Sequence, residues 1–321
     1  MKICLFDPGI ENHTGKPSSN LGDLIIQEAV NREINNIFPN SNIIRYSTQQ
    51  FLEKSHVTDI VSCPLILVGG TNLLSSHILK YQQWKLSLID AIRIKNVVLL
   101  GVGWWQYQKS PDLYTKFFLT SVLNKNKFHS VRDDYTKSML ETAGIRNVIN
   151  TGCPTMWGLT DMKSDDIPTT KADNALLMLT DYSKNIDLDK KLIQLLINNY
   201  QKVYAWPQGR SDKEYLSNLG FSGIFLDHSL PALDEFLNSK ISFDYIGTRL
   251  HGGIRCIMNK RRSLILEIDN RAKEIAKNTG LPTINRADFD YIKNWIIQGS
   301  ITKINIDPFP IKQWKQQFLV N

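Results

Sequence analysis

An alternation of short apolar runs with amphipathic segments constrains the fold of this chain more than any other feature. The runs have the length of single buried strands, and the segments between them repeat apolar residues with a period of about 3.6, the period of a helix. In residues 22–38, for example, Ile26, Val30, Ile34 and Ile37 share one helical face. Strands that alternate with helices form parallel sheets covered on both faces. The sequence therefore predicts an α/β fold.

The alternation falls into two blocks, separated at 158–174 by a polar stretch with Gly and Pro that we interpret as a linker. Block 1–157 predicts strands at 2–6, 42–46, 64–68, 96–100, 128–131 and 148–150, and helices at 22–38, 75–94, 112–123 and 133–143. Block 175–305 predicts strands at 175–179, 202–206, 223–226, 243–246 and 263–267, and helices at 188–200, 212–219, 231–239, 251–258 and 270–278. The tail, 306–321, predicts one more helix at 311–319. Two such blocks indicate two Rossmann-like domains whose parallel sheets face a central cleft.

Candidate binding residues follow the strands, because ligands of parallel α/β sheets bind beyond the carboxyl ends of the strands. Glycines there let the backbone approach a ligand, and free amides at a helix start favour phosphate or carboxylate. In the first block the candidates are Asn20, Gly22, Asp23, Gly70, Thr71, Asn72, His77, Trp104 and Arg132; in the second they are Gln208, Arg249, Leu250, His251, Gly252 and Arg271.

The strongest signal is GTRLHGG at 247–253. In an extended segment Arg249 and His251 point the same way, with Leu250 turned into the core. The Arg249 guanidinium suits a carboxylate or phosphate, and His251 can exchange a proton near neutral pH. The start of the following helix adds a positive field. We interpret the segment as an anion site; the alternative is a packed histidine beside an arginine in a surface ion pair.

The other signals leave alternatives open. One interpretation is that Arg132 faces a cleft. The other is that Asp133 only caps a helix and Arg132 pairs with a neighbour. Asp23 binds a ligand, or it only begins a helix after a tight turn at Gly22. Trp104 and Trp105 form a sugar-stacking platform, or they are core and surface aromatics.

Composition narrows the partners and the chemistry. The net charge of +7 and pI of about 9.1 favour anionic partners, but the basic residues are spread along the chain and no common nucleic-acid motif occurs. The four cysteines are far apart, which predicts reduced thiols and no metal site. The N-terminal pattern predicts a strand and not a signal peptide. No apolar run approaches the length of about 18 residues that a membrane-spanning helix needs. We expect a cytoplasmic protein with no nucleic-acid partner, whose charge also suits peripheral association with the inner membrane face.

Taken together, the strand ends resemble the polysaccharide pyruvyl transferase family over residues 18–282. The resemblance rests on NLGD, VGGTNLL, GVGWWQ, SVRDDYT, TGCPTMW, WPQGRSD, IGTRLHGGIRCIMNKRRSLILEID and the helix at 271–280. That family is similar in architecture to the GT-B glycosyltransferases. It moves the pyruvyl unit of phosphoenolpyruvate onto a sugar, usually as a ketal across two hydroxyls, in surface polysaccharides.

The chain departs from the common pattern of that family in several places. Thr71 stands where many members have a third glycine, Arg271 where many have lysine, and Cys153-Pro154-Thr155 where many have Asp-Pro-Ala. Residues 101–105 stand where many have a Gln-Gly loop. These differences bear on the acceptor more than on the donor.

The resemblance implies roles for the candidates. Phosphoenolpyruvate carries a carboxylate and a phosphate, so we expect Arg249 and Arg132 to bind them and His251 to transfer the proton. No metal or cofactor is implied besides phosphoenolpyruvate as donor. The acceptor, a nucleotide- or lipid-diphosphate sugar, is expected near 20–23, 70–72 and 104–106. Two rival functions remain, a glycosyltransferase that uses a nucleotide sugar and a non-catalytic binder of anionic glycans or nucleic acid.

Overall fold

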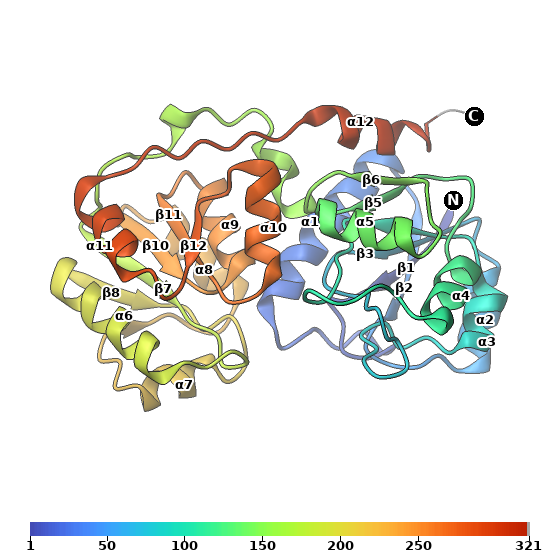
Figure 1. Ribbon diagram of the computed structural model, residues 1–321, viewed down its shortest axis with the longest axis horizontal. Helices are drawn as coiled ribbons and strands as arrows, with labels where there is room; N and C mark the ends of the chain where they lie inside the picture. The colour runs from blue at the N-terminus through green and yellow to red at the C-terminus, as the bar shows by residue number, and fades with distance from the viewer. Residues whose placement is uncertain (320–321) are drawn as a thin grey trace. The chain divides into compact units, whose positions relative to one another are not determined.

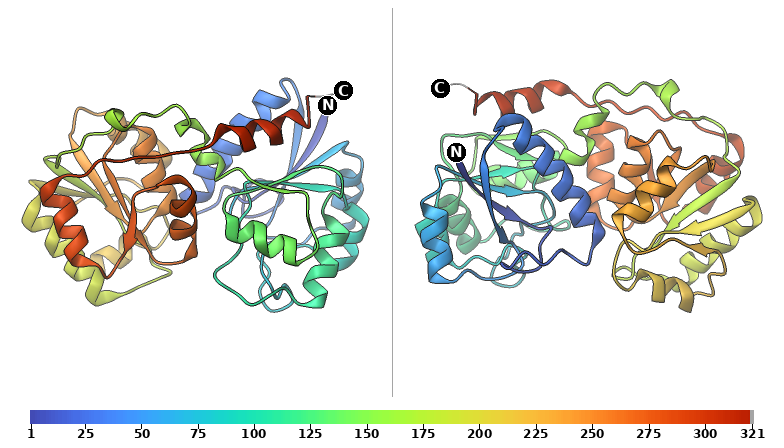
Figure 2. Two further views of the ribbon diagram at one scale, coloured as in Figure 1. Left: turned by 45° about the horizontal axis from the view of Figure 1, so that its top comes forward. Right: turned by 180° about the vertical axis from the view of Figure 1, so that it is seen from behind.

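Two α/β units make up the computed structural model, which describes residues 1–319 (Figures 1 and 2). Unit 1 contains Met1–Ser18, Ile26–Trp157 and the tail from Ile306, and unit 2 contains Ser19–Ile25 and Gly158–Asn305. The division after Trp157 lies where the sequence places the start of the linker. Two segments differ from the predicted domains, because Ser19–Ile25 belongs to unit 2 and the tail belongs to unit 1.

The sheet of unit 1 is parallel and has the order β2-β1-β3-β4. Its strands are β1 (Lys2–Asp7), β2 (Asn42–Ser47), β3 (Leu65–Gly69) and β4 (Val97–Leu100). Two further parallel strands, β5 (His129–Val131) and β6 (Val148–Asn150), continue beside it through a bridge between Val102 and Val131. The helices of this unit are α1 (Leu21–Ile37, whose first turn is in unit 2), α2 (Lys54–Val61), α3 (Leu88–Ile94), α4 (Leu113–Val122), α5 (Asp134–Thr142) and α12 (Pro308–Gln316).

The sheet of unit 2 is also parallel, with the order β12-β11-β10-β7-β8-β9. Its strands are β7 (Asn174–Met178), β8 (Lys202–Ala205), β9 (Ile224–Phe225), β10 (Phe243–Gly247), β11 (Ser263–Glu267) and β12 (Thr283–Asn285). Its helices are α6 (Ile186–Asn199), α7 (Asp212–Asn218), α8 (Leu230–Asn238), α9 (Leu250–Met258), α10 (Asn270–Thr279) and α11 (Phe289–Gln298). The strand order reverses between β7 and β10, which is where doubly wound sheets place their ligands.

Local chemistry explains where these elements begin and why they pack. Side chains of Asp112, Asp133, Ser229 and Asp269 accept hydrogen bonds from the first turns of α4, α5, α8 and α10, as expected of N-caps. The strands β3, β4 and β10 are buried along their whole length, because helices cover both faces of a parallel sheet. The predicted fold class, two Rossmann-like units with parallel sheets, is confirmed.

The prediction of a helix at 75–94 is wrong over its first half, because only α3 is helical there. The side chains of the preceding segment are held by tertiary contacts instead. Ser75 Oγ donates to the Tyr81 carbonyl, the Ser76 amide donates to Gln108, and His77 contacts Asp112. The sequence pattern also missed two α-helices, α2 and α11, and the strand β12.

Candidate functional site

The segment between β10 and α9 is shaped by close packing against β7. The Thr248 amide donates to the Met178 carbonyl, and the Thr180 amide donates to Thr248 Oγ1 at 3.0 Å. A side chain at Gly253 would lie 2.6 Å from the Tyr245 ring and 2.7 Å from Ile265. This glycine therefore lets α9 approach the sheet closely. Helix α9 begins at Leu250 with Arg249 as its N-cap residue, so the predicted extended alternation of Arg249, Leu250 and His251 is wrong.

Arg249 is 3% exposed and forms a two-point ion pair with Asp212, the first residue of α7. Its Nε donates to Asp212 Oδ2 at 2.8 Å, and Nη2 donates to Asp212 Oδ1 and, at 3.4 Å, to Asp181 Oδ1. Asp212 also accepts from the backbone amides of Gly209 and Asp181. Burial raises the pKa of Asp212, and the Arg249 guanidinium opposes that shift. None of these contacts uses Arg249 Nη1.

Tyr182, which the sequence reasoning missed, lies beside both arginines of the predicted site. The Arg249 and Arg271 Cζ atoms lie 5.0 Å and 5.8 Å from the centroid of its ring. Its hydroxyl accepts a hydrogen bond from Arg271 Nη2, and Asp269 binds Arg271 through Nε at 2.9 Å and Nη2 at 2.6 Å. The phenol is 56% exposed, so this cluster reaches the surface at the carboxyl edge of the sheet. The sequence did contain a signal for Tyr182, because this residue follows the first strand of the second block, as the other candidates follow theirs.

We call these six residues the arginine–tyrosine cluster: Asp181, Tyr182, Asp212, Arg249, Asp269 and Arg271. Its formal charges are two guanidinium groups and three carboxylates, a sum of −1. An incoming dianion therefore needs donors beyond the ion-paired nitrogens. Those at hand are Arg249 Nη1, the Tyr182 hydroxyl and the first turn of α9, whose amide dipoles favour negative charge.

Gln208, which follows β8, joins the start of α9 to the NLGD segment. Its Oε1 accepts from the Gly252 amide at 3.1 Å, and its Nε2 donates to Asn20 Oδ1 at 3.3 Å. Its carbonyl accepts from the Leu21 amide. Asn20, Gly22 and Asp23 were predicted on the side of the first domain, but the structure groups them with unit 2.

The packing around Gln208 also explains why residue 22 is glycine. A side chain at Gly22 would clash with the Gln208 amide at 2.5 Å. The Gly22 amide in turn donates to Asn20 Oδ1, and the Asp23 amide donates to the Asn20 carbonyl. Gln208 and His251 are both buried, the latter in the first turn of α9. The structure therefore brings Asn20, Gln208, Gly252 and His251 into one unit.

Arg132 lies in unit 1 and is 1% exposed. Its Nε donates to Asp133 at 3.2 Å, and its Nη2 donates to Asn72 Oδ1. Asp133 is at the same time the N-cap of α5, where it accepts from the Thr136 amide at 2.7 Å. The structure therefore matches the alternative in which Asp133 caps and Arg132 pairs. The contact of Arg132 with a phosphate stays a prediction.

The loop of residues 70–72 is held against β4 and the segment that follows it. Gly70 and Thr71 both adopt left-handed backbone, with φ of 52° and 66°. The Thr71 carbonyl accepts from the Gly103 amide at 2.8 Å, and a side chain at Gly103 would clash with the Arg132 guanidinium. Asn72 then contacts Arg132 as described above. The structure thus brings 70–72 and Arg132 together at one edge of unit 1.

Trp104 does not fit the predicted sugar platform, because its ring is fully buried and its Nε1 donates to Gln108. Trp105 is only partly buried, and its ring stacks on Tyr81 with centroids 3.7 Å apart. His77 is partly exposed and bonds Asp112 at 2.9 Å. Burial tends to raise the pKa of Asp112, but hydrogen bonds from Thr115 and His77 lower it overall.

Among residues 1–319, no group of three or more His, Cys, Asp or Glu is placed to hold a metal ion. Over the same residues, no helix has the length and apolar character needed to span a bilayer.

Comparison with known proteins assigns the chain to a family. The model of the family described as polysaccharide pyruvyl transferase matches residues 20–270, which is most of the chain. The chain belongs to this family. The matched range includes Asn20, Gln208, Arg249 and His251 and ends one residue before Arg271. A search of curated proteins gives no match.

This member of the polysaccharide pyruvyl transferase family has a GT-B-like fold, as its likeness to one solved structure shows. S. aureus MnaA, in a co-structure with UDP, is similar with a TM-score of 0.53 and 13% identity, covering 97% of this chain and 94% of that one. The wall teichoic acid polymerase TagF has a TM-score of 0.45 and 11% identity, covering 99% and 82%. E. coli heptosyltransferase WaaC has a TM-score of 0.35 and 10% identity, covering 83% and 88%. At these identities the likeness concerns the fold alone.

Proposed function

We propose that the protein transfers the pyruvyl group of phosphoenolpyruvate to hydroxyls of a sugar in surface polysaccharide synthesis. The observation that carries the proposal is that the family match covers the β10–α9 segment, where Arg249 and His251 stand at the start of a helix beside a second arginine and an exposed tyrosine. Cations, a phenol and helix amides at the carboxyl edge of a parallel sheet suit a small dianion.

Donor binding follows from the charges of the arginine–tyrosine cluster. Asp212 fixes the orientation of the Arg249 guanidinium by accepting hydrogen bonds from Nε and Nη2. The Nη1 nitrogen then remains as a donor for a ligand. We assign Arg249 Nη1 and the amides of α9 to one acidic group of phosphoenolpyruvate, and the Tyr182 hydroxyl with Arg271 to the other. Because the cluster has no excess of positive charge, binding is expected to depend on this geometry more than on net attraction.

The chemistry balances without any additional reactant. A proton adds to C3 of phosphoenolpyruvate, cationic character develops at C2, and a sugar hydroxyl forms a C–O bond there as it loses its proton. The bond between C2 and the phosphate oxygen then breaks and phosphate leaves. A second sugar hydroxyl forms the other C–O bond at C2, and its proton passes to the departing phosphate. His251, with an imidazole that titrates near neutral pH in water, is assigned the proton transfer at C3.

The acceptor is proposed to be a nucleotide- or lipid-diphosphate sugar. Two features support this choice. The net charge of +7 favours a partner that carries a diphosphate, and the Asn20–Gln208 contact sets two amide side chains beside α9 within unit 2. The acceptor sugar itself is left to the experiment.

The test uses the purified full chain, phosphoenolpyruvate and a panel of nucleotide sugars, with release of inorganic phosphate as the readout. We expect release only when both substrates are present, and loss of release in Arg249→Lys and His251→Ala. Arg210→Ala is the control, because Arg210 is exposed on the loop that carries Gln208. Turnover of a nucleotide sugar without phosphoenolpyruvate would instead make the protein a glycosyltransferase. A His251→Ala variant with wild-type turnover would remove His251 from the mechanism.

A further inference from the structure

Helices α2, α3 and α4 form one layer on the sheet of unit 1. Helix α2 packs against α3, and α3 packs against α4 (Figure 1). Each of them precedes β3, β4 or β5, so each runs back from the carboxyl edge of the parallel sheet to its amino edge. The layer therefore has an outer face and an end at the amino edge, opposite to the edge that carries Asn72 and Arg132.

Five large apolar side chains on these three helices are exposed. Leu113 is 84% exposed and Ile89 is 63% exposed, and Ile92, Phe117 and Val61 are also exposed. Ile89 and Ile92 are one turn apart on α3, and Leu113 and Phe117 are one turn apart on α4, so each pair shares a helix face. Single exposed apolar residues are ordinary, but several on adjacent helices mark an interaction surface. We call these five residues the apolar face.

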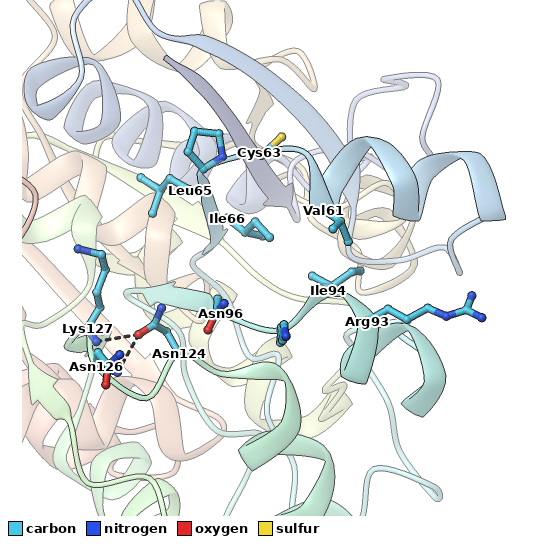
Figure 3. Close-up of a pocket in the computed structure, with 12 residues that line it drawn as sticks. Val61, Cys63, Leu65, Ile66, Arg93, Ile94, Asn96, Asn124, Asn126 and Lys127 are labelled. Carbon is cyan, nitrogen blue, oxygen red and sulfur yellow. Dashed lines mark hydrogen bonds between the residues drawn. The ribbon is translucent and has the colours of Figure 1, made fainter.

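A cavity of about 330 Å³ opens at the amino-edge end of the same layer. Val61 and Ile94 lie on one side of it, and Asn124, Asn126 and Lys127 lie on the other (Figure 3). Three cations line it, Arg93, Lys95 and Lys127, and Arg93 extends outward from its rim (Figure 3). Of the described residues that line the cavity, none is acidic.

The backbone of the cavity wall is unusual at Lys95 and Asn96. Their φ angles are 32° and 60°, although neither is glycine. Residues other than glycine rarely adopt such positive φ angles, and they keep them only where the surrounding structure holds the backbone in place. The opposite wall is fixed too, because Asn124 Oδ1 accepts from the amides of Asn126 and Lys127 at 2.8 Å. The backbone conformation of both walls of the cavity is therefore fixed by contacts within the chain.

We propose that the apolar face and this cavity together dock on a membrane that bears anionic phospholipid. The apolar side chains would enter the interfacial region, while Arg93 and Lys95 bind headgroup phosphates at the cavity. The Lys127 ammonium donates to the Gln317 carbonyl at 3.3 Å and lies over the Phe318 ring, so it is left out of this role. Exposed apolar and cationic side chains on the same helix, such as Ile92 and Arg93 of α3, are a combination that binds anionic membrane surfaces. The acidic groups on α2 and α3, Asp59 and Asp90, accept hydrogen bonds from Tyr46 and Ser87 within unit 1.

A second copy of the chain fits this surface less well than a membrane does. In a two-fold dimer both copies bury the same face, so Arg93 and Lys95 of both copies would lie in one interface. Like charges at an interface oppose association. The membrane inference concerns unit 1 alone and does not depend on pyruvyl transfer.

The experiment is co-sedimentation of the full chain with vesicles of phosphatidylcholine, with or without about one third phosphatidylglycerol. We expect binding to the anionic vesicles only, and a decrease at high salt. The double variant Arg93→Glu/Lys95→Glu should weaken binding by more than tenfold, since each cation near such a surface contributes about fivefold. The double variant Leu113→Glu/Phe117→Glu should abolish vesicle binding. The residues of both double variants are exposed, so the variants should fold like the unchanged chain.

Matched controls come from unit 2, where Ile186→Glu/Ile297→Glu and Lys190→Glu/Lys293→Glu change exposed residues of the same types. These controls should bind like the unchanged chain. Absence of binding to anionic vesicles, or equal binding by all variants, would overturn the proposal. So would two other results: stabilisation by inorganic phosphate that requires Lys95 without vesicle binding, or a dimer in solution that Leu113→Glu/Phe117→Glu dissociates.

Discussion

Asp212 and Arg249 form a buried two-point ion pair that links the start of α7 to the start of α9. The carboxylate is fully buried, and two backbone amides complete its hydrogen bonds. The pair therefore fixes the orientation of the guanidinium before any ligand arrives. Sequence reasoning identified Arg249 from its position after a strand, but not the carboxylate that positions it, because Asp212 lies 37 residues away along the chain.

Replacing Asp212 by asparagine should destabilise unit 2 strongly. The substitution leaves the Arg249 charge buried with a neutral partner, and breaking a buried pair costs about 3–5 kcal/mol. Urea unfolding of the full chain measures the loss. Asp234→Asn is the matched control, because the Asp234–Arg255 pair is partly exposed and should contribute less than about 1 kcal/mol. Equal losses in the two variants would mean that burial of the Arg249 pair is energetically unimportant.

Tyr182→Phe should separate ligand binding from folding. The change removes the hydroxyl that accepts from Arg271 but keeps the ring beside both guanidinium groups. The ring is exposed, so the melting temperature of the free protein should change little. Stabilisation by phosphoenolpyruvate in a thermal-shift assay should fall. Tyr291→Phe, an exposed tyrosine elsewhere in unit 2, should respond like the wild type. An unchanged response in Tyr182→Phe would exclude its hydroxyl from donor binding.

Gln208→Glu should lose one of the two side-chain contacts at this position. A carboxylate still accepts from the Gly252 amide but cannot donate to Asn20 Oδ1, so two oxygens would face each other at that contact. Gln208→Ala loses both contacts and leaves a buried polar amide unpaired, at a cost of about 1–3 kcal/mol. Gln208 is 3% exposed and neither of its side-chain contacts is a cation, so the carboxylate of Gln208→Glu would also be a buried, unpaired charge. We expect the free energy of unfolding to fall in the order wild type, Gln208→Ala, Gln208→Glu. If the glutamate variant matched the wild type, the Asn20 contact would contribute nothing.

The strands and most helices were predictable because their signals are local. Apolar runs identify β1, β3 and β10, and a period near 3.6 identifies α1. The irregular segment before α3 was not predictable, since it is held by Gln108 and Asp112 from later in the chain. A pattern within one segment carries no information about such partners.

The candidate site was predictable in position but not in pairing. Strand-end reasoning found Arg249, Arg271 and Gln208, which the structure places at one edge of unit 2. It did not find that Asn20 reaches Gln208 across 188 residues, or that Arg132 is buried against Asn72. Residue type and strand position predict which groups gather at a sheet edge. Which group neutralises which depends on tertiary packing.

His129 predicts how the stability of unit 1 depends on pH. Its Nδ1 accepts from the Leu99 amide and its Nε2 donates to the Asn124 carbonyl, so the neutral ring satisfies both contacts. Burial lowers the pKa of His129 to about 4, against a weaker opposing effect of the Asn124 carbonyl. The unfolded chain, with a histidine pKa of about 6.5, binds the proton first as pH falls. The stabilising contribution is therefore complete above about pH 6.5 and is lost toward about pH 4, on the order of 3 kcal/mol in total.

The measurement is the urea midpoint of wild type and His129→Phe at about pH 7.5 and about pH 5. The variant should be less stable than wild type at the higher pH, because the Leu99 amide and Asn124 carbonyl lose their partner. Its further loss at the lower pH should be smaller, since the phenylalanine takes up no proton. His228→Gln, which changes a partly exposed histidine, should keep the wild-type drop. A His129→Phe variant that also kept the full drop would assign the acid sensitivity to other groups.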